Sequence, residues 1–164
     1  MDLWTPLIAG HVIVASYVLV LGPFNIFRRK RDRVHKVIGF TWVAAIAVTC
    51  ISSFWIMDEG HFTWLHGLSV FTLTTVTLGI ISAARGNIPA HRGNMIGSYL
   101  GTLIAFIFAA TAPGRRLPML VSTEPATVAF AAILILATVA AFFFTLKRTV
   151  RSEFRPVATP LARP

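Results

Sequence analysis

Residues 126–146 read ATVAFAAILILATVAAFFFTL, a stretch of 21 residues without a single charged side chain. An α-helix rises about 1.5 Å per residue, so a stretch of this length extends about 30 Å, the thickness of the hydrocarbon core of a bilayer. Its apolar side chains occupy nearly every face of such a helix, as lipid on all sides requires. The stretch therefore predicts a transmembrane helix.

Four earlier stretches have similar length and composition, at residues 3–27, 34–57, 62–84 and 90–112. Hydrophobic residues make up 55% of the 164 residues and charged residues 13%, which is too little charge to cover a soluble domain of this size. The sequence predicts an all-α integral membrane bundle of about five transmembrane helices, with a four-helix core and one C-terminal helix. This bundle occupies residues 1–146, and residues 147–164 form a basic tail.

The basic residues predict how the bundle is oriented. Thirteen of the 15 Lys and Arg residues lie in the first loop, the third loop and the tail, and only Arg115 and Arg116 fall on the opposite side. Because basic loops stay in the cytoplasm, we expect the N-terminus outside and the tail inside. The net charge of +9 then indicates contact with the anionic inner leaflet of the lipid bilayer and no nucleic-acid partner.

Four histidines lie in or at the ends of different predicted helices. The up-and-down threading places His11 and His66 in the outer half, on the first and third helices. It places His35 and His91 at the inner face, where the second and fourth helices begin. Ionisable side chains at membrane depth are costly, so these positions are candidates for function.

A facing pair of histidines is the axial ligand set of a b-type haem, and an apolar bundle can bury the porphyrin. We therefore expect His11 with His66, and His35 with His91, to be metal ligands of one or two haems b. Basic side chains at the inner face could pair with haem propionates, and glycines could leave room for the ring. The expected cofactor-binding residues are Arg33, Lys36, Arg92, Gly39 and Gly97.

Simpler interpretations stand beside this one. A histidine at a helix end can bond to a headgroup, water or carbonyl, and the glycine row of the fourth helix is also typical of plain helix packing. Asp58, Glu59 and His61 form either a solvated loop or a small outer metal site.

Four motifs in the chain resemble an uncharacterised bacterial family of predicted membrane proteins with a domain of unknown function. They are a histidine in the first span, His-Arg-x-x-Gly opening the second, a histidine opening the third, and His-Arg-x-x-Met opening the fourth. Here they correspond to His11, to His35 with Gly39, to His66, and to His91 with Met95; Lys36 replaces the usual arginine of the second motif. The resemblance covers roughly residues 5–117 and leaves the last helix outside. It implies a bacterial inner-membrane protein and brings no established activity.

The alternation of histidines between helices is also similar in arrangement to transmembrane dihaem b-type cytochromes. This similarity implies a haem b-binding electron-transfer protein, either an electron carrier or a membrane oxidoreductase, that serves a quinone or a redox partner protein. The alternative is a haem-free accessory or assembly subunit, which would pack against a larger membrane complex through its glycine face. A small transporter fits less well, because the sequence shows no internal repeat and no acidic residue in mid-membrane.

Overall fold

The computed structural model describes residues 5–28, 31–57, 61–112 and 116–153, and these residues form five long helices and one short helix. All five long helices are long and apolar enough to cross a membrane. The prediction of an all-α bundle with about five transmembrane helices is confirmed. The helices are α1 (Pro6–Ile26), α2 (Arg33–Ser53), α3 (Trp64–Ala84), α4 (Ile88–Thr111), α5 (Arg116–Thr123) and α6 (Pro125–Glu153).

The predicted helix boundaries lie within three residues of the observed ones except at the ends of α2 and α6. Helix α2 ends at Ser53 rather than at residue 57, because the chain turns at Phe54 and Trp55. Helix α6 continues to Glu153, so the first part of the predicted tail is helical. Helix α5 lies between two predicted spans, in a stretch to which the sequence analysis assigned no helix, because its eight residues are too few for a membrane-length hydrophobic pattern.

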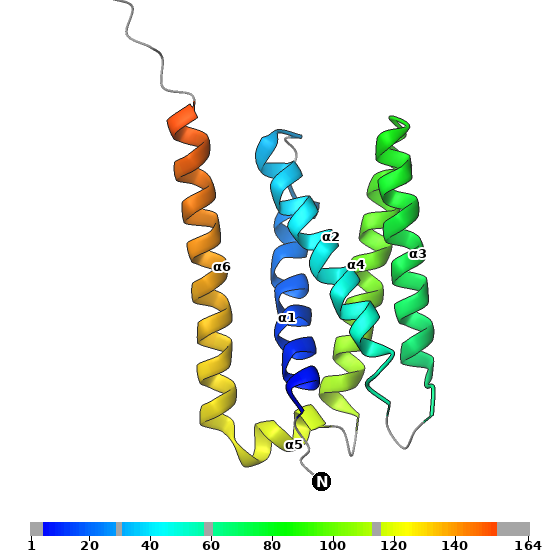
Figure 1. Cartoon of the computed structure of the whole chain (residues 1–164), viewed down its shortest axis with the longest axis vertical. Helices are drawn as coiled ribbons and strands as arrows, with labels where there is room; N and C mark the ends of the chain where they lie inside the picture. The colour runs from blue at the N-terminus through cyan, green and yellow to red at the C-terminus, as the bar shows by residue number, and fades with distance from the viewer. Residues whose placement is uncertain (1–4, 29–30, 58–60, 113–115, 154–164) are drawn as a thin grey trace, which may run out of the picture.

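The bundle consists of two antiparallel helix pairs, α1 with α2 and α3 with α4, and α6 stands beside α1 (Figure 1). The first pair packs on the second through α2 against α3 and α1 against α4. The α1–α2 loop, the α3–α4 loop and the end of α6 lie at the same end of the bundle (Figure 1). We call this the basic end, because it carries Arg28, Arg31, Arg33, Lys36, Arg85, Arg92, Lys147 and Arg148. Helix α5 and the α2–α3 connection lie at the opposite end.

The core is centred on Trp42 of α2, where three helices meet. The indole Nε1 of Trp42 donates a hydrogen bond of 2.9 Å to the carbonyl oxygen of Val18 in α1, and the side chain is buried. Tyr99 of α4 packs against the same region and donates to the carbonyl of Leu19 at 3.4 Å. Both rings come close to Gly22, where a Cβ atom would lie only 2.5 Å from Cδ2 of Tyr99. Glycine is therefore required at this contact.

Short polar side chains join the helices elsewhere. The hydroxyls of Ser53 and Ser69 are 2.8 Å apart between α2 and α3, and those of Thr75 and Ser98 are 2.8 Å apart between α3 and α4. Small hydroxyl-bearing residues let transmembrane helices approach closely and share hydrogen bonds. Gly101 belongs to the same α3–α4 contact, since a Cβ there would lie 2.9 Å from Oγ1 of Thr72.

Candidate functional site

The structure brings His35 and His91 together at the basic end. His35 lies in the first turn of α2 and His91 in the first turns of α4, so each helix N-terminus positions one ring. Their ring centroids are 6.5 Å apart and the ring planes make an angle of 77°. Both side chains are half-buried. The sequence predicted that these two histidines lie at the same end of the bundle, and the structure adds that their rings are neighbours, with nearly perpendicular planes.

The protonation of His91 follows from its hydrogen bond. Its Nδ1 lies 2.9 Å from the backbone carbonyl of Gly79 in α3, and a carbonyl oxygen can only accept. Nδ1 therefore carries the proton, and Nε2 carries a lone pair in the neutral ring. A bond from Nδ1–H to a backbone carbonyl is the usual way in which proteins orient a metal-binding histidine.

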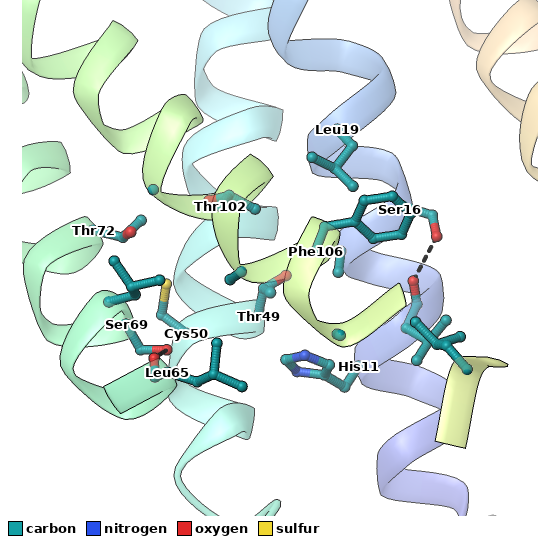
Figure 2. Close-up of a pocket in the computed structure, with 17 residues that line it drawn as sticks. His11, Ser16, Leu19, Thr49, Cys50, Leu65, Ser69, Thr72, Thr102 and Phe106 are labelled. Atoms are coloured by element: carbon teal, nitrogen blue, oxygen red, sulfur yellow. Dashed lines mark hydrogen bonds between the residues drawn. The ribbon is translucent and has the colours of Figure 1, made fainter. Parts of the chain in front are cut away.

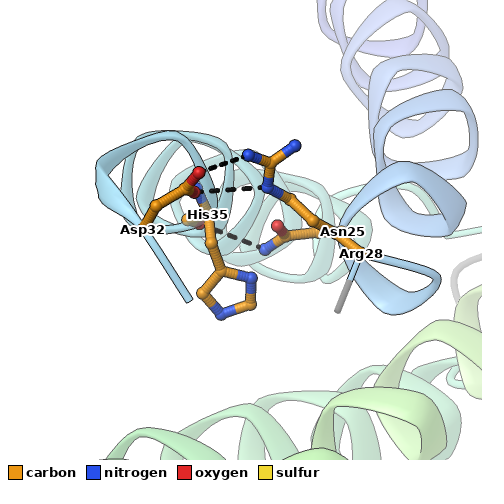
Figure 3. A network of polar contacts seen from close by, with 4 residues as sticks. All are labelled: Asn25, Arg28, Asp32 and His35. Carbon is orange, nitrogen blue, oxygen red and sulfur yellow. Dashed lines mark hydrogen bonds and ion pairs between the residues drawn. The ribbon is translucent and has the colours of Figure 1, made fainter. Parts of the chain in front are cut away.

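His35 has a ring nitrogen with no partner. Its Nδ1 is buried and makes no hydrogen bond, and the same holds for Oδ1 of Asn25 in α1. Figure 3 shows that the ring points away from the polar contacts made by its backbone, among them the bond of 3.3 Å from Nδ2 of Asn25 to the carbonyl of His35. Buried polar atoms are nearly always paired, so the unpaired ring nitrogen of His35, next to a second histidine, is a candidate for ligand binding.

An ion pair holds the start of α2 in place. The carboxylate of Asp32 accepts the backbone N–H of His35 at 3.1 Å and the guanidinium Nη2 of Arg28 at 2.5 Å (Figure 3). The hydrogen bond from Arg28 is the main reason why the pKa of Asp32 lies below its usual value, and the backbone bond from His35 adds to it. Asp32 thereby links the helix terminus that carries His35 to the end of α1.

The other expected cofactor-binding residues fall into two groups. Arg33, Lys36 and Arg92 are exposed at the basic end, within one or two residues of His35 or His91 along the chain. Gly97 has open space around it, since an added Cβ would meet nothing within 4 Å. Gly39 differs, because a Cβ there would lie 3.2 Å from Nδ2 of Asn25. Gly39 thus allows α1 and α2 to approach each other.

The structure does not bring His11 and His66 together in the same way. The ring of His66 packs against Phe62 and Phe54, with centroids 4.9 and 6.1 Å away. Its Nδ1 accepts the backbone N–H of Thr63 at 2.9 Å, which makes His66 part of the N-terminal cap of α3. Nε2 then carries the proton, the reverse of the arrangement in His91. The spacing Thr63-x-x-His66 resembles a capping box and was the overlooked signal for this role.

His11 instead lines a partly open cavity of about 160 Å³, whose other lining residues come mainly from α1, α2, α3 and α4, with Leu117 of α5 at its border. Figure 2 shows the ring directed from α1 toward the residues of α2 and α3 that surround the cavity. His66 is not among the lining residues. The polar side chains of the lining are His11, Ser16, Thr49, Cys50, Ser69, Thr72 and Thr102.

In the described part of the chain, no three His, Cys, Asp or Glu side chains are grouped so that they could hold a metal ion. The alternative outer site falls partly outside this part, because Asp58 and Glu59 are not described; His61 is described and is exposed. A bare metal ion usually needs three or four protein ligands, whereas a haem supplies four nitrogens itself and needs only two. The His35–His91 pair offers two imidazoles, too few ligands for a bare metal ion.

These features define a multi-spanning α-helical membrane protein with a histidine pair near one end. The sequence profile of the family described as "Predicted membrane protein (DUF2306)" matches residues 8–147. The chain belongs to this family. The match includes most of α6, so the expectation that the last helix lies outside the resemblance was wrong. No curated protein and no solved structure matches the chain.

Proposed function

We propose that this protein is a haem b-binding electron carrier of the membrane that holds a haem between His35 and His91. The observation that carries the proposal is the separation of 6.5 Å between the two ring centroids. Metal–imidazole bonds are about 2 Å long, so two rings on opposite sides of one metal have centroids roughly 6 Å apart. The observed separation matches this value.

The hydrogen bonding of the two imidazole rings supports His35 and His91 as the ligand pair. Nε2 of His91 carries a lone pair because Nδ1 donates to Gly79, and Nδ1 of His35 is buried without a partner. Nε2 of His66 is likewise buried without a partner, but it carries the proton of the neutral ring because Nδ1 accepts from Thr63, and the role of His66 in the cap of α3 argues against a second haem at the opposite end. The proposal is therefore one haem rather than two.

The surroundings suit a porphyrin with two propionates. Arg33, Lys36 and Arg92 are positively charged side chains at the basic end that can pair with carboxylates. Gly93 and Gly97 follow His91 along α4, and an added Cβ at either would meet nothing within 4 Å. When bound, a haem supplies reversible one-electron chemistry, while the helices hold and orient it and keep water away.

The distribution of basic residues supports a cytoplasmic location for the His35–His91 site. If the basic end follows the positive-inside rule, it lies in the cytoplasm and the opposite end lies outside, which suits the inner membrane of a bacterium. Trp55 and Trp64 at the opposite end are exposed, as expected for indoles at a membrane interface. The electron donor and acceptor would be a quinone or a redox partner protein.

The test is the visible spectrum of the full-length protein purified from cells supplied with haem precursor. We expect a Soret band, sharp bands on reduction, and about one haem per chain. His35→Ala and His91→Ala each remove an axial ligand and should abolish the low-spin spectrum. His61→Ala is the matched control, since His61 is exposed outside the site.

A colourless protein that also takes up no added haem would overturn the proposal. Unchanged haem content in both His35→Ala and His91→Ala would overturn the ligand assignment. The haem-free accessory subunit would then be the better account, and the open faces of Gly93 and Gly97 are the observation that favours it, because another helix could pack there.

A further inference from the structure

The cavity beside His11 lies toward the end of the bundle opposite the His35–His91 pair and has no part in the proposed haem site. Its volume of about 160 Å³ is close to that of an engineered apolar cavity, about 150 Å³, that holds one benzene ring. Leu65, Leu68 and Phe106 supply much of its apolar lining, and Phe106 is exposed on the bundle surface. The cavity therefore has the size of one six-membered ring and a border that reaches the surrounding lipid.

The protonation of His11 can be worked out from its neighbour Ser52. The hydroxyl of Ser52 donates its one proton to the carbonyl of Thr49 at 3.0 Å. The contact of 2.8 Å between Nδ1 of His11 and Oγ of Ser52 is then a bond in which the ring donates. Nε2 of the neutral ring is left with a lone pair and acts as a hydrogen-bond acceptor.

Most hydroxyls of the cavity lining are acceptors for the same reason. Ser16, Thr49 and Thr102 each donate to a carbonyl one turn earlier in their own helix, at 2.7, 2.9 and 3.0 Å. The proton of Ser69 is also used within the bundle, because its hydroxyl lies 2.8 Å from that of Ser53, which itself donates to the carbonyl of Cys50, and 3.4 Å from the carbonyl of Leu65. Because these hydroxyls donate their protons within the bundle, they can only accept hydrogen bonds from a bound ligand. A complementary ligand is an apolar ring that brings hydrogen-bond donors of its own.

We propose that this cavity binds the head group of a quinol, with one ring hydroxyl donating to Nε2 of His11. A quinol is lipid-soluble and carries a single ring with two hydroxyl donors. The oxidised quinone has carbonyl acceptors in their place, which would face the lone pairs of His11 and of the hydroxyls. His11 and four of the five lining hydroxyls therefore favour the reduced form, whereas the hydroxyl of Thr72 keeps a proton that an oxygen of either form can accept. This inference names a partner class for the proposed electron carrier, but binding requires no haem.

The experiment measures binding of a short-chain ubiquinol and its ubiquinone to the full-length protein in lipid nanodiscs, under anaerobic conditions. Bound ligand is extracted and quantified by chromatography, and haem content is determined on the same samples. We expect quinol to bind more tightly than quinone. His11→Phe keeps a ring but removes the acceptor and should weaken quinol binding about tenfold, the effect of one buried hydrogen bond, with little effect on quinone. His61→Phe is the control.

A second variant keeps the experiment decisive if His11→Phe does not fold. Ala105→Leu adds three carbons to a half-buried position of the lining and should reduce binding of quinol and quinone alike while His11 is intact. Equal affinity for the two forms, or equal binding by His11→Phe and His61→Phe, would overturn the proposal. Quinol binding by a protein without haem would leave this inference intact and overturn only the proposed function.

Discussion

Replacing Gly22 by alanine tests the central helix contact directly. A Cβ at this position would lie 2.5 and 2.7 Å from Cδ2 and Cε2 of Tyr99 and 3.1 Å from Nε1 of Trp42. Both neighbours are rigid rings, so relief requires that α4 move away from α1 or that the Trp42 indole shift. The indole shift would also strain its bond to the carbonyl of Val18.

The expected loss of stability combines three effects. Alanine favours a helix over glycine by about 1 kcal/mol, which is a gain. Overpacking a tight contact costs about 1–3 kcal/mol, and loss of the buried hydrogen bond of Trp42 costs a further 1–3 kcal/mol, roughly. The net result for Gly22→Ala is a destabilisation of about 1–5 kcal/mol. Gly10→Ala is the matched control in the same helix, because its Cβ would meet nothing within 4 Å and only the gain applies.

The free energy of unfolding can be measured in mixed micelles by titration with a denaturing detergent, followed by circular dichroism and tryptophan fluorescence. Gly22→Ala should shift the midpoint to lower denaturant, and Gly10→Ala should leave it unchanged or raise it. Equal midpoints for the two variants would refute the packing argument. A partial recovery in the double variant Gly22→Ala, Tyr99→Leu would identify the ring of Tyr99 as the obstacle.

Two other predictions concern the basic end and the topology. The pKa of Asp32 is lowered in the folded protein, so its contribution to stability is present above the ordinary value of 3.8 and is lost as the pH falls through the lowered pKa. Protection of the amides of residues 33–36 against hydrogen exchange, relative to the intrinsic exchange rate at each pH, should therefore fall in acid, and Asp32→Asn should remove this pH dependence of the protection; an unchanged acid response in that variant would contradict the assignment. For the topology, reporter fusions after Arg163 and within residues 116–123 should give opposite signals, because α6 is a membrane-length helix that lies between the two fusion points. A shared signal would mean that the number of crossings is wrong.

Much of the fold could be predicted from the sequence because lipid imposes a strong constraint. Every membrane-spanning segment must be long and apolar, and this property needs no knowledge of partners. The same reasoning could not find α5, whose eight residues carry no membrane-length signal. It also misplaced the end of α2, since Trp55 and Met57 are apolar enough to continue a hydrophobic stretch after the helix has ended.

The candidate site could be predicted only in part. The alternation of helices was enough to place His35 and His91 at one end, but their facing rings depend on how α2 and α4 rotate about their axes. His66 and His11 show the limit of that reasoning. The sequence pattern placed both in the outer half of the bundle, yet a local bond to Thr63 holds the ring of His66 at its own helix cap, and Ser52 turns the ring of His11 toward a cavity. The orientation of each ring is set by the hydrogen bonds that its side chain makes, and hydropathy does not reveal these bonds.

The pairing of neighbouring helices also bears on how this protein is made. Most helix contacts join α1 to α2 and α3 to α4, which follow each other directly in the chain. Each hairpin can therefore assemble as soon as its second helix leaves the ribosome, before the next hairpin has been synthesised. Helix α6 is different, because its contact with α1 through Tyr17 and Thr138 joins residues 121 positions apart. Biogenesis would thus end with α6 entering beside helices that are already in place, and shortened nascent chains lacking α6 should still form both hairpins.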